Sequence, residues 1–244
     1  AYATIRRGLT TGCNQIFVNP RLKEDNEYLM DIISSPKAVS GFATTNAETD
    51  KLLVVKSESI LSNEIKKYLA NLEKTIAKAN KPKTLAEKIK KGEQWYLLNV
   101  ADCYGILFGY MVRNDMRFIL NNSGMIARDN FYVISPSIDI HIMLALLNNY
   151  YVFAQLEMNG RKYGGGMLKL QKYDVESLTL TNLTAASDAD QAGQKELGHM
   201  LAESGEREII DDITMLLSRY ESVGFQEIKT QFEYMRSNRL EFGK

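Results

Sequence analysis

The sequence predicts an α+β fold: a mixed, strongly twisted sheet with packed helices, followed by an acidic helical C-terminal region. Short apolar runs bounded by turn residues indicate the strands. Apolar residues at three- and four-residue steps between Leu61 and Ile76 indicate an amphipathic helix. The same spacing returns after Leu183, where residues 181–244 carry 7 basic and 12 acidic residues. We therefore expect a domain over residues 1–183 and an acidic helical appendage over 184–244.

The elements of the first half follow from local patterns. Residues 4–18 predict a strand, a loop and a second short strand, and the run 51–56 predicts a buried strand. Ser59 or Ser62 is suited to cap the amphipathic helix, which Lys81-Pro82 ends. Residues 85–91 predict one or two further helical turns. More strands are expected at 95–100, 106–112, 118–120 and 131–134, with a turn at 121–124.

The second half is richer in helix. Residues 138–157 are too apolar and too long for one strand, so they predict a single buried helix with Ser137 as its cap. A flexible loop is expected at 164–166, a brief strand at 168–170 and a short helix at 173–178. Residues 184–194 lack large apolar side chains and predict a linker or a fraying helix start. Two or three helices are expected from there to Met235.

Charge is distributed unevenly along the 244 residues, although the formal net charge is zero. Residues 1–180 hold 23 Lys and Arg against 18 Asp and Glu, and residues 51–91 alone hold 11 lysines against 4 glutamates. The two cysteines show no metal-ligand spacing and suit a reducing compartment. Apolar runs are too short to cross a membrane. We expect a cytoplasmic protein with no membrane partner and a basic body.

The segment Ile5–Phe17 combines cations, glycines and hydrogen-bonding side chains. Gly8 and Gly12 allow the backbone to turn tightly or to approach a ligand closely. Arg6 and Arg7 can neutralise phosphate, and Asn14 can read a base edge or cap a turn. The alternative is a strand followed by a glycine-rich surface loop with no ligand.

Three blocks, in order, resemble the target-recognition domain of TaqI-type adenine-N6 DNA methyltransferases of restriction-modification systems. The first is the Arg-Gly-x-x-Thr-Gly-x-Asn-x-x-Phe run at 7–17. The second is the strand-like run 128–134 with the Leu-Ala-Leu-Leu-Asn-Asn run at 144–149. The third is Gly-Arg-Lys-Tyr-Gly-Gly-Gly-Met-Leu-Lys-Leu at 160–170. The exit at 178–182 lacks the proline that the family shows at that point.

This resemblance implies a C-terminal specificity domain that binds double-stranded DNA beside a catalytic methyltransferase domain. S-adenosylmethionine is expected in that other half, with no cofactor, catalytic residue or metal site in this chain. The sequence agrees, because its single Asn-Pro pair, at 19–20, continues with Arg-Leu and not with the Pro-Tyr of a catalytic loop. The parent is expected to be a site-specific adenine DNA methyltransferase; whether it also cuts DNA is left open.

Candidate DNA contacts lie in the three blocks and among nearby cations. Asn14, Gln15, Arg113 and Arg128 have side chains suited to bidentate base contacts. Ion pairs with Asp115 and Asp129 are the alternative for the two arginines. The Arg-Lys-Tyr run before the three glycines can meet a phosphate backbone. The complete set is Arg6, Arg7, Thr11, Asn14, Gln15, Arg113, Arg128, Arg161, Lys162, Tyr163 and Lys169.

Two other functions remain open at this stage. A protein-interaction module would use the basic helix and the acidic region for subunit contacts. A metal-dependent nuclease would use Asp212, Glu227 and Lys229, because an acidic residue followed by Glu-x-Lys occurs in restriction endonucleases. The apolar spacing around Glu227 is helical, however, which favours a solvated helix face over a strand-borne metal site.

Overall fold

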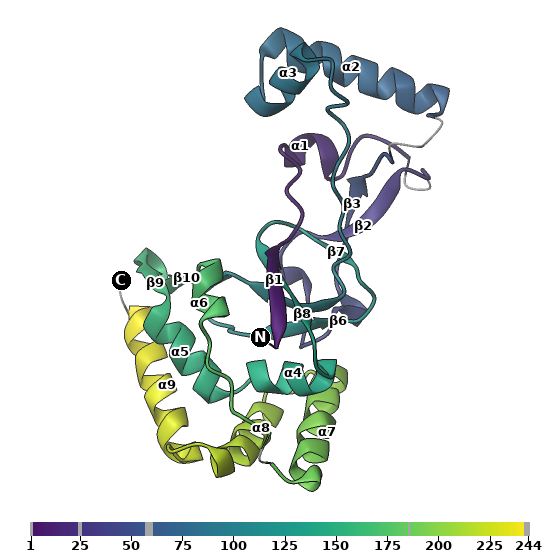
Figure 1. The fold of residues 1–244 in the computed structure, drawn as a ribbon. Coiled ribbons are helices and arrows are strands. Elements are labelled where there is room, and N and C mark those ends of the chain that lie inside the picture. Colours follow the sequence, from purple (N-terminus) through teal and green to yellow (C-terminus); the bar gives the residue numbers. More distant parts are fainter. Residues whose placement is uncertain (1, 24–25, 57–60, 185, 242–244) are drawn as a thin grey trace. The chain divides into compact units, whose positions relative to one another are not determined.

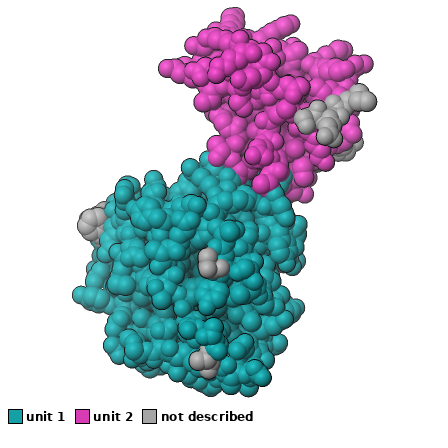
Figure 2. Space-filling model, viewed as in Figure 1, with its two compact units in different colours: residues 1–8, 33–48, 102–244 teal, residues 9–32, 49–101 magenta. Residues whose placement is uncertain are grey.

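The structure is a computed structural model that describes residues 2–23, 26–56, 61–184 and 186–241. Its helices and strands confirm the α+β class. The chain forms two compact units, coloured separately in Figure 2: unit 1 comprises residues 1–8, 33–48 and 102–244, and unit 2 comprises residues 9–32 and 49–101. These units divide the chain at other positions than the expected boundary at 183/184. The C-terminal helices belong to unit 1.

The main sheet of unit 1 has the strand order β1-β8-β4-β6, with each neighbouring pair antiparallel. Ile134 of β8 pairs with Ile5 of β1 on one side and with Ile106 of β4 on the other. A second sheet has the order β5-β10-β9. The strands named in unit 1 are β1 (Ala3–Arg7), β4 (Gly105–Gly109), β5 (Met111–Val112), β6 (Phe118–Asn121), β7 (Ile126–Ala127), β8 (Phe131–Pro136), β9 (Arg161–Tyr163) and β10 (Met167–Lys169).

The single strand expected over 106–112 is wrong, because β4 and β5 belong to different sheets. Gly109 ends β4 where the backbone passes close to the Pro36 ring; a Cβ at Gly109 would lie 2.4 Å from Pro36 Cγ. Tyr110 then carries the chain into β5. Since the apolar run continues through this bend, its pattern shows no break.

The helices of unit 1 share one apolar core with the main sheet. Figure 1 shows α7, α8 and α9 arranged around α4 and α5. Ile213 of α8 and Phe232 of α9 belong to the same buried cluster as Phe108 of β4. None of the helices in the described ranges is both long and apolar enough to traverse a bilayer. These helices are α4 (Ile140–Leu147), α5 (Tyr150–Asn159), α6 (Lys172–Glu176), α7 (Asp188–Ser204), α8 (Ile209–Leu217) and α9 (Phe225–Glu241).

The single helix expected over 138–157 is wrong, because two asparagines divide it. The Asn148 amide pairs with the Phe118 backbone, accepting from its N–H at 2.9 Å and donating to its carbonyl at 3.0 Å. Asn149 then caps α5 by accepting a hydrogen bond from the Val152 N–H at 3.0 Å. Asp139, not Ser137, caps α4. Both asparagines are buried, so these bonds replace the helical bonds lost at the break.

Of the two expectations for residues 184–194, the helix start is confirmed. Ser187 accepts a hydrogen bond from the Asp190 N–H and caps α7. Further along α7, Gly198 allows two helices to pack closely, because a Cβ there would lie 2.0 Å from the His141 carbonyl oxygen of α4.

Unit 2 contains a short hairpin-like pair of strands and a two-helix segment. Two expectations fail here: α1 replaces the second strand of residues 4–18, and 95–100 forms no strand, only a bridge from Leu97 to Val55. Trp95 is instead buried against Phe17, with ring centroids 6.4 Å apart. Ser62 is confirmed as the cap of α2, and Ser59 lies outside the described residues. The elements are α1 (Asn14–Phe17), β2 (Leu29–Ile33), β3 (Asp50–Leu53), α2 (Asn63–Ala79) and α3 (Lys83–Lys90).

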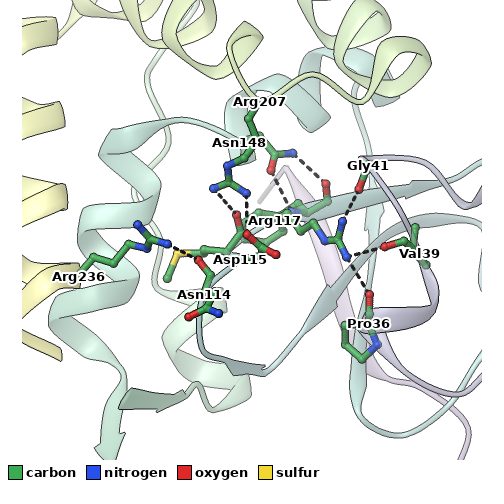
Figure 3. A network of polar contacts seen from close by, with 11 residues as sticks. Pro36, Val39, Gly41, Asn114, Asp115, Arg117, Asn148, Arg207 and Arg236 are labelled. Carbon is green, nitrogen blue, oxygen red and sulfur yellow. Dashed lines mark hydrogen bonds and ion pairs between the residues drawn. The ribbon is translucent and has the colours of Figure 1, made fainter. Parts of the chain in front are cut away.

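Arg117 holds the 36–41 segment of unit 1 through backbone carbonyls, as Figure 3 shows. Its guanidinium donates to the carbonyls of Gly41, Pro36 and Val39 at 2.9, 2.9 and 2.6 Å. Burial lowers the pKa of Arg117. One planar donor group thus satisfies three carbonyls of a segment that begins with the 3-10 turn Pro36–Ala38.

A histidine pair joins α4 to α7. The rings of His141 and His199 have centroids 4.9 Å apart. Burial lowers the pKa of His141, and the nearby His199 and Lys195 lower it further, whereas Asp139 and Glu203 act in the opposite direction. The folded protein therefore favours a neutral His141.

This pair makes stability depend on pH. Because the pKa of His141 is lower in the folded state than its ordinary value of 6.5, its contribution is complete above that value and is lost as the pH falls through the folded-state pKa. We expect the melting temperature to fall between about pH 7.5 and about pH 5.5, and to fall less in His141→Gln, which cannot gain a proton. Calorimetry at several pH values measures both. Equal pH profiles for the two proteins would contradict the assignment.

Candidate nucleic-acid interface

The two arginines that end β1 point to different surroundings. Arg6 donates to the Asp102 carbonyl and lies 3.4 Å from the Cys103 sulfur, so its guanidinium is used inside unit 1. Arg7 keeps a side chain that is 55% exposed. Alternation along the strand separates the two neighbours. Arg7 is therefore the member of the pair that is available to a ligand.

Arg7 is exposed but held in place. Its Nε donates to the Asp129 carbonyl at 2.7 Å and its Nη2 donates to the Tyr110 hydroxyl at 3.0 Å. The guanidinium also lies over the Tyr110 ring, 5.5 Å from the centroid. The Asp129 carboxylate lies 3.8 Å from Arg7 and 3.6 Å from Arg128. Two cations thus share one carboxylate, and the group of Arg7, Tyr110, Arg128 and Asp129, called here the arginine cluster, is net positive.

The second sheet forms a cationic ribbon. In its register Lys169 of β10 lies between Met111 of β5 and Arg161 of β9, and Met167 pairs with Tyr163. Side chains two positions apart on a strand share a face, so these five form one face, called here the hairpin face. Met111 and Tyr163 are exposed by 43% and 46%, which shows that this face is not covered.

Tyr110 connects the arginine cluster to the ribbon. It immediately precedes β5, and its carbonyl accepts a hydrogen bond from the Leu170 N–H at 2.9 Å. The Tyr132 hydroxyl donates to the Leu170 carbonyl at 3.2 Å, and the Tyr110 and Tyr132 rings lie 5.3 Å apart. Arg7 is therefore anchored to the same ribbon from which Arg161 and Lys169 project.

Two predicted cations are less constrained. Lys162 lies in the exposed edge strand β9, opposite the buried Leu168. Arg113 is exposed just beyond the end of β5. Asp115, the alternative partner of Arg113, lies 3.6 Å from Arg207. For Arg128 the alternative to a DNA contact is present, since it pairs with Asp129 and its side chain is 28% exposed.

The remaining predicted residues form a separate group in unit 2. The Thr11 hydroxyl donates to the Asn14 side-chain oxygen at 2.8 Å, and Asn14 begins α1. Asn14 and Gln15 are exposed, whereas Thr11 is buried. Gly12 has a φ of 75° and lies against Leu85 of α3. The glycine is therefore needed for the turn, and Thr11 supports Asn14 instead of facing a ligand.

Two segments were candidates for cofactor or metal binding: the glycine loop at 164–166 and the acidic segment with Glu227 and Lys229. Gly164–Gly166 connects β9 to β10 within a hairpin, so it is not the loop before a helix that holds a nucleotide. The glycine loop therefore lacks the strand-to-helix setting of such a site. Glu227 and Lys229 lie in α9, which confirms the helical interpretation of that segment. Across the described part of the chain, no three His, Cys, Asp or Glu side chains are grouped to hold a metal ion.

Comparison with protein families assigns the domain. The family described as "Type II methyltransferase M.Eco57I, C-terminal domain" matches residues 1–217. The chain belongs to this family. The match covers the three sequence blocks, the arginine cluster and the ribbon, and it ends at α8. It confirms the C-terminal recognition domain that the three blocks indicated.

Two known proteins are similar to this family member. The Type II methyltransferase M.AccI of Acinetobacter calcoaceticus is 25% identical over 207 residues, which are 75% of this chain and 36% of M.AccI. The chain therefore spans about a third of that relative. The solved type IIG restriction endonuclease BpuSI has a TM-score of 0.64 and 13% identity, over 99% of this chain and 30% of BpuSI. At that identity the likeness concerns the fold.

The sequence gives no signal for Tyr110, which holds Arg7 and is not distinguished locally from other surface residues. It indicates Asp129 only as an ion-pair partner of Arg128, whereas the Asp129 carbonyl also holds Arg7. Glu157 did carry a signal. It is the only Asp, Glu, Lys or Arg between His141 and Gly160, and a lone carboxylate in such a segment indicates a buried partner. That partner is Arg239 of α9.

Gly8 permits the close approach that places Arg7 beside Arg128. A Cβ at Gly8 would lie 2.2 Å from the Arg128 carbonyl oxygen and 2.6 Å from that of Ala127. We expect Gly8→Ala to destabilise unit 1 by about 1–3 kcal/mol, because both neighbours are backbone and must move. Urea unfolding measures this. Gly164→Ala is the control, since no atom lies within 4 Å of its Cβ position; equal stability losses would contradict the prediction.

Proposed function

We propose that this chain is the DNA-recognition domain of a Type II restriction-modification methyltransferase that modifies adenine at N6. Its family membership over residues 1–217 supports the methyltransferase context. The three sequence blocks that resemble TaqI-type enzymes support adenine as the base. Double-stranded DNA and the catalytic domain of the parent protein are the proposed partners, and the cytoplasm is the proposed location.

The hairpin face is the observation that carries the proposal for DNA. It presents the exposed Arg161 and Tyr163 and the half-buried Lys169 on one small sheet. Arg7 is fixed to the same ribbon. Within this three-stranded sheet, β9 and β10 form a two-stranded hairpin. A two-stranded ribbon fits the major groove of B-DNA, and its cations neutralise phosphates. Since Arg7 is already held by Asp129 and Tyr110, little side-chain entropy is lost when it meets a ligand.

Unit 2 supplies a different kind of contact. Residues 63–91, which span α2 and α3, contain 9 lysines and 3 glutamates. All of these lysines except the half-buried Lys88 are exposed. Lysines of this kind attract the phosphate backbone without reading sequence. The exposed amides of Asn14 and Gln15 are suited to base edges. We assign general attraction to α2 and α3, and base contacts to the start of α1.

The methyl transfer itself is assigned to the rest of the parent protein. This chain spans 36% of M.AccI, which leaves most of such a protein outside it. S-adenosylmethionine and the residues that hold a flipped adenine are placed there. The role of this chain is to bind duplex DNA, select the site and keep the duplex in register with the catalytic domain.

Duplex binding with a salt dependence tests this role. We expect the wild-type chain to bind a 30-base-pair duplex, with affinity that falls steeply with salt. Arg161→Ala combined with Lys169→Ala should weaken binding about tenfold and reduce the slope of log K against log salt by about 2, one for each lost phosphate contact. Fluorescence anisotropy over a salt series measures both quantities.

Lys195→Ala combined with Arg219→Ala is the control, because it removes the same charge from cations that pair with Asp139 and Asp190. Its slope and affinity should remain close to those of the wild type. If both double variants lose equal DNA affinity, then DNA binding depends on the net charge of the chain and not on the position of the hairpin cations. Absence of DNA binding together with self-association in sedimentation would favour the protein-interaction module instead.

The modified base is tested on the parent protein. The complete polypeptide that contains this chain, incubated with S-adenosylmethionine and mixed-sequence DNA, should produce N6-methyladenine. Mass spectrometry of the digested nucleosides identifies the product. Methylcytosine in place of methyladenine would overturn the adenine assignment and leave the DNA-recognition role standing.

A further inference from the structure

Arg239 and Glu157 form a fully buried ion pair in unit 1. Arg239 is 1% exposed and Glu157 is 0% exposed at the side chain. The guanidinium binds both carboxylate oxygens, at 2.7 Å through Nε and at 2.8 Å through Nη2. Burying two charges is costly unless their geometry and remaining hydrogen bonds are satisfied. The third nitrogen of Arg239 therefore needs a partner too.

That partner is the carbonyl of Gly166, to which Nη1 donates. Gly166 ends the loop between β9 and β10, so one side chain of α9 joins α5 to the hairpin. The loop is closed by glycines with φ of 70° at Gly165 and 72° at Gly166. At Gly166 a Cβ would also lie 3.0 Å from the Leu240 Cα of α9. The loop thus has the shape that α9 requires, and only glycine fits there.

The hairpin depends on this support because its own strands are short. β9 and β10 have three residues each, and all three residues of the edge strand β9 are exposed. Strands of this length are weakly held by their own ladder. The α9 helix lies beyond residue 217, where the family match ends. A segment outside that match therefore supports the surface that carries Arg161 and Lys169.

We propose that Arg239 is a positioning residue for DNA binding. By holding the Gly166 carbonyl from within the core, it fixes the β9–β10 hairpin so that Arg161, Tyr163 and Lys169 present one preformed face. The C-terminal helix α9 is thereby part of the recognition machinery and not an appendage to it. The role of Arg239 in DNA binding rests on the proposed DNA-recognition function. Its effect on the hairpin rests on the contacts of its guanidinium alone.

The decisive variant combines Glu157→Leu with Arg239→Met. It keeps the net charge of the chain, and exchanging a buried ion pair for apolar side chains of similar size is often neutral for stability. It removes the bond to Gly166. We expect a melting temperature close to wild type and faster hydrogen exchange at residues 161–169. We expect about tenfold weaker binding to the 30-base-pair duplex, the loss proposed for the hairpin cations themselves.

A double-mutant cycle separates positioning from general loosening. If Arg239 acts through the hairpin, adding Arg161→Ala and Lys169→Ala to the decisive variant should weaken DNA binding little further. Additive losses would mean that the pair acts elsewhere and would overturn the proposal. Arg236→Met is the matched control on the same helix, because Arg236 donates to the Asn114 carbonyl at the surface and not to the hairpin loop, among the residues that the structure describes. It should leave exchange at 161–169 unchanged.

The results separate two questions: whether Arg239 holds the hairpin, and whether the position of the hairpin matters for DNA binding. If hydrogen exchange at 161–169 is unchanged in the folded variant with Glu157→Leu and Arg239→Met, the inference is overturned, whatever happens to DNA binding. Faster exchange with unchanged affinity overturns the role of the hairpin's position in binding. If the wild type binds no DNA, the proposed function fails, and exchange still reports whether Arg239 holds the hairpin. Should the double variant not fold, Arg239→Lys, which keeps the charge but loses the planar fork, repeats the comparison.

Discussion

The buried guanidinium of Arg239 is the contact on which the form of the cationic ribbon depends. It satisfies a carboxylate 82 positions earlier in the chain and a carbonyl 73 positions earlier. Neither partner alone would compensate the cost of burying the charge. The consequence is a strict geometry: α5, α9 and the glycine loop meet at one place, and the hairpin that projects from that place has one position.

The acidic C-terminal segment of this protein does not form a separate compact unit. Residues 184–241 carry an excess of acidic side chains, but their apolar side chains, such as Leu201, Ile213 and Phe232, complete the core of unit 1. Amphipathic helices place their charged side chains toward solvent and their apolar side chains toward the core. The charge asymmetry along the chain is therefore a property of the surface. It does not mark the limit of a compact unit.

The candidate contacts differ in how firmly they are held. Arg7 is fixed by a carbonyl, a hydroxyl and an aromatic ring, and such a planar donor recognises its partner by geometry. The lysines of α2 and α3 are exposed, apart from the half-buried Lys88, and act as point charges on flexible stems. In the function proposed here, the first kind of contact sets register on DNA and the second kind sets attraction. The two kinds lie in different compact units, a division that a list of cations in sequence order does not reveal.

The sequence by itself determined the α+β class, the amphipathic helix between Leu61 and Ile76, the helical turns at 85–91 and, through motifs that resemble a known family, the C-terminal recognition domain. These depend on periodicity, caps and short motifs, which are local. Only the tertiary structure decided which arginine of the β1 pair faces outward, where the 138–157 segment breaks, and what neutralises Glu157. Each of these is settled by a partner far along the chain: Asp102 for Arg6, Phe118 for Asn148 and Arg239 for Glu157. Local patterns record the need for a partner, as the lone Glu157 does, but folding brings the partner into contact.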